Sequence, residues 1–390
     1  MFSERTNWRL AHNRFTQAIE EVRSSGKTIL DLSASNPTRV ELKYDSDSIL
    51  SALHSPQSLD YDPQPKGLLP ARQAVAAYYR NEHAISNLDP ERIVLTASTS
   101  EGYSYVFRLL CNAGDELLVP KPSYPLFEFL ADLQDVKLVP YPLIYDHGWQ
   151  MDFHSMTKVV SSRTKGVVVV HPNNPTGSFV RPSEFEALNN FCQEHELAVI
   201  ADEVFLDYVL DEQPWASFAG NESVLTFTLS GLSKISALPQ MKAAWIVTSG
   251  PKTQVDAAIA RLEVIADTYL SMNAPIQWAL PSLLQQRHTI QQQLQQRVKC
   301  NLAELDRQLA LQSSCHRLRL DGGWYAVLRV PVLQSDEELA IRLVTEKSVI
   351  VHPGHFYDFP SEGYLVLSLI TIPADFEAGL RGVLELLAGY

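Results

Sequence analysis

Short apolar runs alternate with longer amphipathic stretches over the first three quarters of the chain. The runs "RIVLT", "ELLVP", "GVVVV", "LAVIAD" and "VLTFTLSG" are short and apolar, as buried strands are. Between them, stretches such as "PARQAVAAYYRNEH" repeat apolar residues every three or four positions, which predicts helices. Strands that alternate with helices predict an α/β fold with a doubly wound, mostly parallel sheet.

The pattern changes after about residue 285. A long helical stretch, "TIQQQLQQRVKCNLAELDRQLA", precedes the short strands "GGWYAVLRVP", "VIVHPG" and "YLVLSLI" and a last helix. Because 390 residues exceed the usual size of one hydrophobic core, we expect two domains. The predicted division is a large domain over 46–284 and a smaller α+β domain over 285–390. The N-terminal segment, 1–45, is expected to pack with the small domain.

Composition excludes several classes of protein. A net charge of −13 argues against broad binding to nucleic acid or to anionic membranes. The four cysteines are scattered without a CxxC pair, so we expect neither a metal site nor a disulfide framework. The first residues lack the apolar core of a signal peptide, and no apolar run is long enough to span a bilayer. These features predict a cytoplasmic protein with small-molecule ligands.

Polar clusters follow the predicted strands, at the edge where open α/β sheets bind ligands. The helix start in "TASTSEG" suits a phosphate, although simple N-capping is the favoured explanation for this motif alone. "HPNNPTG" by itself is a turn. Asp202 ends an apolar strand, where a carboxylate is costly unless it has a partner or caps the next segment. Lys234, in "SGLSKISALPQMK", would by itself be interpreted as a solvated loop lysine.

Taken together and in this order, these motifs resemble the class I/II family of pyridoxal-phosphate aminotransferases, which have fold type I. The resemblance extends from about Leu32 to Ser368. It implies a transferase that uses pyridoxal 5'-phosphate to move an amino group from an amino acid or related amine to a keto acceptor. It also implies a homodimer with shared active sites, and it makes 46–284 the cofactor-binding domain.

The resemblance implies a role for individual side chains. Lys234 resembles the lysine that forms a Schiff base with the cofactor and then carries a proton. Asp202 resembles the partner of the pyridinium nitrogen, and Asn174 the donor to the phenolic oxygen. The other implied contacts are ring stacking by Tyr124, phosphate binding by Thr99, Ser100, Ser233 and Lys242, and phosphate binding in the neighbouring subunit by Tyr61.

Three positions around the cofactor depart from the family pattern. Lys242 stands where the family usually has an arginine, so the phosphate loses a bidentate partner. Gly231 replaces a frequent serine, for which Ser230 or Ser233 can compensate. Phe205 replaces a tyrosine that bonds the phenolic oxygen in many members. The cofactor is expected to be retained with altered contacts.

The substrate end departs further. Val366, in "YLVLSLI", occupies the place of the arginine that clamps the substrate carboxylate. Ser35, in "SASNP", replaces a glycine of the loop that approaches the same carboxylate, beside Asn36. Arg39 and Arg329 are candidate replacement cations, although a solvated or ion-paired arginine is the favoured explanation for each. A substrate whose carboxyl group is masked or absent is the competing interpretation.

Other functions are compatible with parts of the pattern. A lyase, decarboxylase or racemase would use the same cofactor and lysine, with a different bond broken. A ligand-sensing regulator would need an added DNA-binding domain, whereas only about 30 residues precede the first strand. A nicotinamide-dependent enzyme would need a GxGxxG loop after a first strand, and the sequence has none. We therefore predict an aminotransferase.

Overall fold

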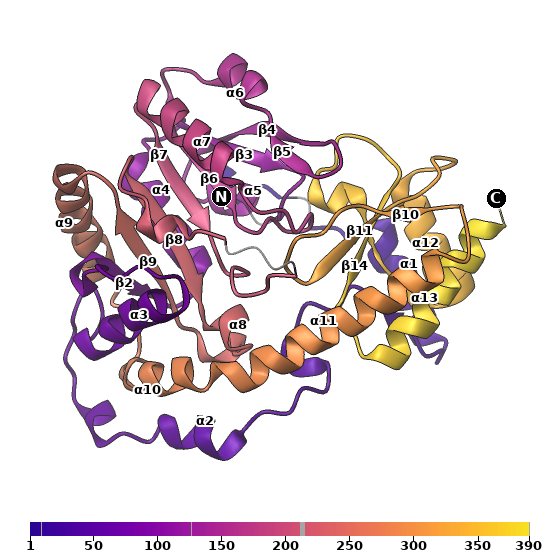
Figure 1. The fold of residues 1–390 in the computed structure, drawn as a ribbon, viewed down its shortest axis with the longest axis horizontal. Coiled ribbons are helices and arrows are strands. Elements are labelled where there is room, and N and C mark those ends of the chain that lie inside the picture. The colour runs from indigo at the N-terminus through magenta and orange to yellow at the C-terminus, as the bar shows by residue number, and fades with distance from the viewer. Residues whose placement is uncertain (9, 126, 211–214, 390) are drawn as a thin grey trace.

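The computed structural model describes residues 1–8, 10–125, 127–210 and 215–389. A large sheet with helices on both faces lies beside a smaller sheet that has its own helices (Figure 1). The large sheet has eight strands in the order β2-β9-β8-β7-β6-β3-β4-β5. Their bounds are β2 Ile93–Thr96, β3 Glu116–Lys121, β4 Lys137–Tyr145, β5 Trp149–Met151, β6 Thr164–Val170, β7 Ala198–Asp202, β8 Thr226–Gly231 and β9 Ala244–Ser249.

The centre of this sheet is parallel, which confirms the predicted fold class. The pairs β4–β3, β3–β6, β6–β7 and β7–β8 run parallel, whereas β9 runs antiparallel to both of its neighbours. Consequently β2, on the far side of β9, points in the same direction as β8. The carboxyl ends of β2, β3, β6, β7 and β8 therefore all lie along one edge of the sheet.

Burial on both faces explains why the strands are continuous apolar runs. In β6, Val168 and Val170 pack with α4 Thr99–Leu110, α5 Phe127–Asp132 and α9 Lys252–Tyr269. Val167 and Val169 point to the opposite face, because successive strand residues alternate. The helices on that face are α3 Leu69–Glu82, α6 Phe153–Val159, α7 Pro182–Glu194, α8 Leu232–Ile235 and α10 Ala274–Gln285.

The smaller sheet is antiparallel, in the order β10-β11-β14-β13. Helix α10 ends at Gln285 and α11 begins at Arg287, so a junction between two helices lies at the expected boundary at residue 285. Helix α11 is long and extends from α10 to this sheet (Figure 1), and the division into domains stays a prediction. The remaining elements are α1 Arg14–Ser24, α2 Ser46–Ala52, α11 Arg287–Leu309, β10 His316–Arg317, β11 Tyr325–Arg329, α12 Asp336–Lys347, β13 His352–Pro353, β14 Tyr364–Ser368 and α13 Pro373–Ala388.

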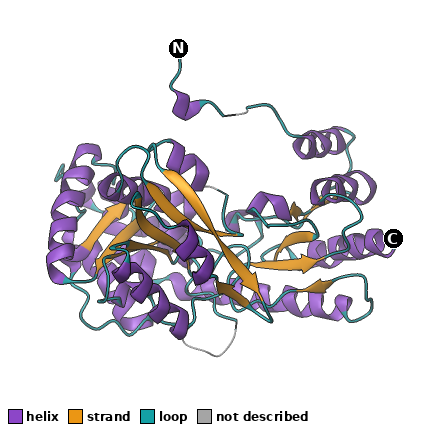
Figure 2. Ribbon diagram, turned by 90° about the horizontal axis from the view of Figure 1, so that it is seen from above, coloured by secondary structure: helices purple, strands orange, loops and turns teal. Residues whose placement is uncertain are grey.

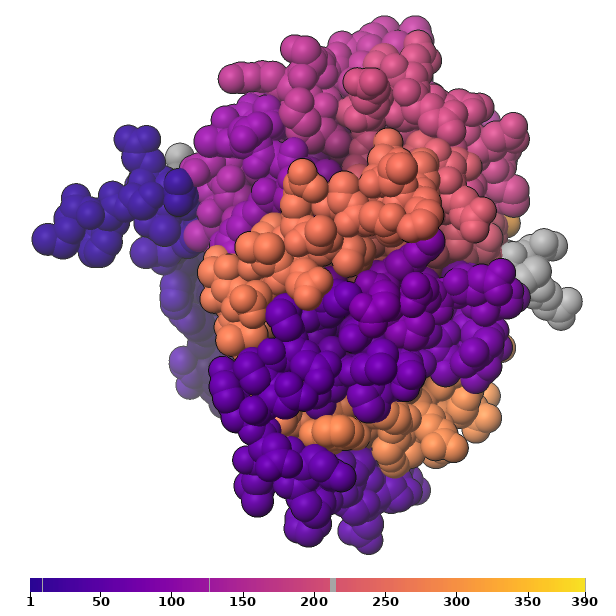
Figure 3. Space-filling model, turned by 90° about the vertical axis from the view of Figure 1, so that its left-hand side faces the viewer, coloured from indigo at the N-terminus to yellow at the C-terminus, as the bar shows by residue number. Residues whose placement is uncertain are grey.

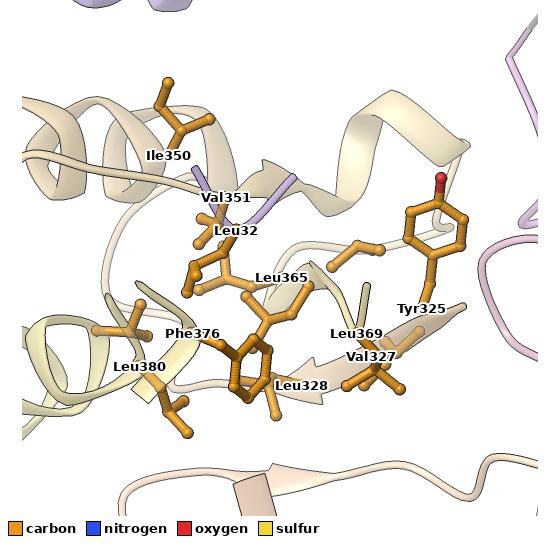
Figure 4. Packing of buried hydrophobic residues seen from close by; sticks show 14 of the residues in the cluster. Leu32, Tyr325, Val327, Leu328, Ile350, Val351, Leu365, Leu369, Phe376 and Leu380 are labelled. Atoms are coloured by element: carbon orange, nitrogen blue, oxygen red, sulfur yellow. The ribbon is translucent and has the colours of Figure 1, made fainter. Parts of the chain in front are cut away.

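The N-terminal segment joins this smaller sheet through backbone and side-chain contacts. Strand β1 Leu30–Asp31 pairs parallel with β12 Val349–Ile350, and these two strands form a separate small sheet beside it. Leu32 is fully buried and packs among core residues that include Leu365, Phe376 and Leu380 (Figure 4). The backbone N–H of Ser368 donates to the carbonyl of Leu32 at 2.7 Å. These contacts fix the loop that follows Leu32 against the end of β14.

In Figure 2, residues 1–8 lie outside the packed layers. They contact α5, where the Trp8 indole packs on Phe129 and its Nε1 donates to Asp132 at 2.9 Å. Across the described ranges, none of the helices combines the length and apolar character needed to cross a membrane.

Candidate active site

A cavity of about 250 Å³ lies at the carboxyl edge of the large sheet, where it meets the smaller sheet. Residues from five strand ends and from the N-terminal loop line it. The structure brings together eight of the side chains that the sequence singled out: Ser35, Thr99, Ser100, Tyr124, Asn174, Asp202, Ser233 and Lys234. These residues lie up to 199 positions apart in the sequence, from Ser35 to Lys234, and the fold makes them one site.

Lys234 is held by a tight connection after β8. A side chain at Gly231 would place its Cβ 2.7 Å from the Ala243 carbonyl oxygen, so this crossing requires glycine. The Tyr208 hydroxyl donates to the backbone carbonyl of Lys234 at 2.7 Å. The Lys234 amine lies 5.0 Å from the ring centroid of Trp324 and 5.4 Å from that of Phe205.

This apolar surrounding changes the acidity of the amine. Burial lowers the pKa of Lys234 from 10.5 to about 8, and the Asp202 carboxylate acts in the opposite direction. A larger fraction of the amine is therefore neutral near pH 7 than for an exposed lysine. Only the neutral amine can attack a carbonyl carbon, so the surroundings prepare Lys234 for that reaction.

Asp202 is the last residue of β7 and is held by two hydrogen bonds. The backbone N–H of Val204 donates to Oδ1 at 3.1 Å, and the Tyr103 hydroxyl donates to Oδ2 at 3.0 Å. Burial raises the pKa of Asp202 to about 6, while these two donors and Lys234 lower it. A cationic ring nitrogen at this carboxylate would lower the pKa further and keep the pair ionised.

The start of α4 has the geometry that an anion site requires. Ser98 is the N-cap, and its hydroxyl accepts from the backbone N–H of Glu101. The N–H groups of Thr99 and Ser100 belong to the first turn, which has no intrahelical acceptors. They line the cavity with Ser233, and the positive end of the helix dipole favours a phosphate there.

Asn174 and Tyr124 complete the predicted cofactor contacts. Asn174 is buried, lines the cavity, and its Oδ1 has no hydrogen-bond partner among the described residues. A buried acceptor without a partner is costly, which indicates that a ligand donates to it, whereas the predicted bond to the phenolic oxygen would come from Nδ2. Tyr124 lines the cavity with its side chain partly exposed, as a ring-stacking residue requires. The cavity therefore combines a lysine, a carboxylate, an amide and a helix start, and this set of groups fits pyridoxal phosphate.

Five predicted site residues lie away from the cavity. Lys242 is exposed and takes a left-handed backbone conformation, with φ of 52°. Arg39 is exposed, and Asn36 caps the same short turn through its side chain. Arg329 stacks on Tyr364 at 4.3 Å and donates to the carbonyl of Glu362.

The fifth is Tyr61, which is 84% exposed and lines a separate surface cavity of about 260 Å³.

Sequence reasoning missed several residues of the site. Tyr103 lies four residues after Thr99 in α4, and this helical spacing could have placed it on the same face. Tyr325, His352, Phe356 and Tyr357 also line the cavity. They come from β11, β13 and the turn after it, and no local motif shows that the smaller sheet presents them to the larger one.

Residues 27–369 match the sequence model of the family described as aminotransferase class I and II. The chain therefore belongs to this family, whose members depend on pyridoxal phosphate. It is an enzyme of the aminotransferase class, as predicted.

Relatives support the same class across nearly the whole chain. Alanine aminotransferase of Mycobacterium tuberculosis is 26% identical, with 96% of this chain and 89% of the relative covered. Glutamate-pyruvate aminotransferase AlaA of Escherichia coli is 24% identical, with 95% and 93% covered. The structure of alanine aminotransferase from Pyrococcus furiosus superimposes with a TM-score of 0.90 over all of both chains at 20% identity, which shows a shared fold. An S-alkyl-thiohydroximate lyase of Arabidopsis thaliana is 28% identical, with 66% of this chain and 57% of the lyase covered.

Proposed function

We propose that the cavity at Lys234 binds pyridoxal 5'-phosphate and that the enzyme moves an amino group from an amino acid or related amine to a keto acceptor. The observation that carries this proposal is the pairing of Lys234 and Asp202 in one cavity, at the ends of neighbouring strands. When bound, the cofactor supplies an electron sink for the carbon that bears the amino group.

Each side chain of the cavity would have its own role in this reaction. Lys234 attaches the cofactor through its carbonyl carbon and, once released, holds the proton that moves from the substrate carbon. Asp202 keeps the ring nitrogen protonated, and Tyr103 fixes the carboxylate in place. Asn174 would orient the cofactor ring by a hydrogen bond to the phenolic oxygen of that ring. Tyr124 would cover one face of the ring, and the start of α4 would bind the phosphate.

We further propose that the active unit is a homodimer. The face that carries α2, α3 and α10 (Figure 3) exposes the large apolar side chains of Leu50, Leu59 and Tyr61, at 61%, 91% and 84%. Such exposure is typical of a surface that another chain covers. Tyr61 would reach the phosphate bound by the second copy. Sedimentation tests this: a dimer is expected, and a stable monomer with full activity would contradict it.

A lyase reaction is the second candidate, because one of the relatives carries that activity in its name. The two reactions differ in their products. Incubation of the cofactor-loaded enzyme with a donor should convert the cofactor to its amine form, and a keto acid should then reverse this spectral change. Release of ammonia, carbon dioxide or a thiol without an acceptor would instead favour the lyase or decarboxylase.

A further inference from the structure

Beside the predicted cofactor contacts, the cavity is lined by a group of uncharged aromatic side chains that form an aromatic wall. They are Phe205, Tyr325, His352, Phe356 and Tyr357. The hydroxyl of Tyr357 and Nδ1 of His352 are hydrogen-bonded to each other at 3.0 Å. Burial lowers the pKa of His352, so its ring is neutral near pH 7. Burial also raises the pKa of Tyr325 and of Tyr357, which keeps both phenols protonated.

The position of Tyr325 shows how this wall is built. Tyr325 pairs across the sheet with Ser368, whose hydroxyl donates to the carbonyl of Ala34, next to Ser35. The Tyr325 hydroxyl points away from the packed core of Val327 and Leu369 (Figure 4). No partner for it is found within the described ranges. The wall therefore offers one free hydroxyl donor, at the place where Ser35 also meets the cavity.

The cations considered for a carboxylate lie elsewhere. Val366 is 1% exposed and belongs to the core of the smaller sheet, so it does not reach the cavity. Arg39 and Arg329 are not among the residues that line it. Among the described residues that line it, the cation is Lys234, which the proposed function already assigns to the cofactor. A carboxylate buried against this wall would be hydrogen-bonded by phenols but not neutralised, which is unfavourable in a dry site.

We propose that the amino substrate is a primary amine without a free carboxylate on its α carbon, with an aromatic or apolar group packed on this wall. This inference rests on the proposed function and narrows its substrate class. An amide or ester in place of the carboxylate would accept a hydrogen bond from Tyr325, and a plain amine would leave that hydroxyl to water.

Three donors of similar size test the inference with the cofactor-loaded enzyme: L-phenylalanine, L-phenylalaninamide and 2-phenylethylamine. Single-turnover conversion of the cofactor, followed by absorbance, should be at least about tenfold more efficient with a donor that lacks the carboxylate than with phenylalanine. The faster of these two carboxylate-free donors distinguishes an amide from a plain amine. Equal or faster conversion with phenylalanine would overturn the inference.

Binding of amine-free analogues gives a readout that does not depend on turnover. By calorimetry, 3-phenylpropanamide should bind at least about tenfold more tightly than 3-phenylpropionate. Tighter binding of the propionate, or binding of neither compound, would overturn the inference. If no donor converts the cofactor while the amide analogue still binds more tightly than the propionate, the proposed function is contradicted and the substrate class is supported.

The Tyr325→Phe variant tests the hydroxyl. It should slow conversion of the cofactor by phenylalaninamide more than conversion by phenylethylamine. An equal loss of rate with both donors would contradict the contact between Tyr325 and the amide.

Discussion

The hydroxyl of Tyr103 donates a 3.0 Å hydrogen bond to Oδ2 of Asp202. It comes from α4, whose first turn is also the predicted phosphate site, so one helix positions both ends of the proposed cofactor. The second oxygen of Asp202 is held by the backbone of Val204. The carboxylate therefore has a single fixed orientation in the cavity.

We predict that Tyr103→Phe weakens cofactor binding without unfolding the protein. A hydrogen bond to a charged group contributes about 1.5–3 kcal/mol, so the dissociation constant should rise at least about tenfold. Equilibrium titration of the apoprotein measures it. Tyr105→Phe is a matched control, because Tyr105 is on the same helix but does not line the cavity. Equal affinities for both variants would contradict the role of Tyr103.

Asp202→Asn should leave the shape of the site nearly unchanged and remove its negative charge. The ring nitrogen would then lose the partner that keeps it protonated, and we expect turnover to fall by about 10²-fold or more. Steady-state kinetics at saturating cofactor tests this. A variant within about fivefold of the parent would show that the carboxylate has only a structural role.

The rate at which the apoprotein takes up the cofactor should depend on pH through Lys234. Because burial lowers the pKa of Lys234 to about 8, the neutral amine increases up to that pH and then saturates. Stopped-flow measurements should therefore show a plateau above about pH 8. Asp202→Asn should move the plateau to lower pH, since the carboxylate raises the pKa of Lys234. A rate that continues to rise towards pH 10.5 would indicate an ordinary exposed lysine.

Phe205 lines the cavity, at the position where the family resemblance implies a tyrosine. We predict that Phe205→Tyr adds a donor to the phenolic oxygen and so stabilises its anionic form. The pH at which the visible absorbance of the bound cofactor titrates should be higher in the parent than in the variant. Titration of both proteins by absorbance measures the difference. The same midpoint in both would contradict the prediction.

Leu32 connects the N-terminal segment to the core of the smaller sheet. The Leu32 side chain is fully buried, so Leu32→Ala should lower the free energy of unfolding by about 2–5 kcal/mol. Urea unfolding measures it. Leu311→Ala is the control, because Leu311 is 77% exposed and should change stability by less than about 0.5 kcal/mol. If Leu32→Ala lowered the free energy of unfolding by a similarly small amount, Leu32 would not belong to this core.

Much of the fold could be predicted from the sequence because local patterns encode it. The apolar strands β6 and β7 are buried on both faces, and such runs are visible without any structure. Asp202 and Lys234 lie at or shortly after the ends of buried strands, but each alone has a plain interpretation, and the order of motifs that resembles the aminotransferase family singled them out. Their convergence then follows from the common direction of parallel strands.

The substrate wall could not be predicted in the same way, because it depends on how two sheets meet. Arg329 shares a strand face with Tyr325, but four residues of a strand separate them by roughly 13 Å. Tyr325 therefore reaches the cavity, whereas Arg329 stacks on Tyr364. Lys242 has the expected spacing from Lys234, yet a left-handed turn leaves it exposed. Spacing along the chain does not determine these directions.

The most direct test of the account is to locate the lysine that carries the cofactor. Protein loaded with pyridoxal phosphate is reduced with borohydride, digested and mapped by mass spectrometry. The account predicts a pyridoxyl group on Lys234 and none in Lys234→Ala, which should also lose the visible absorbance of the bound cofactor. Labelling of Lys242 or another lysine in place of Lys234, or absorbance that survives in Lys234→Ala, would contradict it.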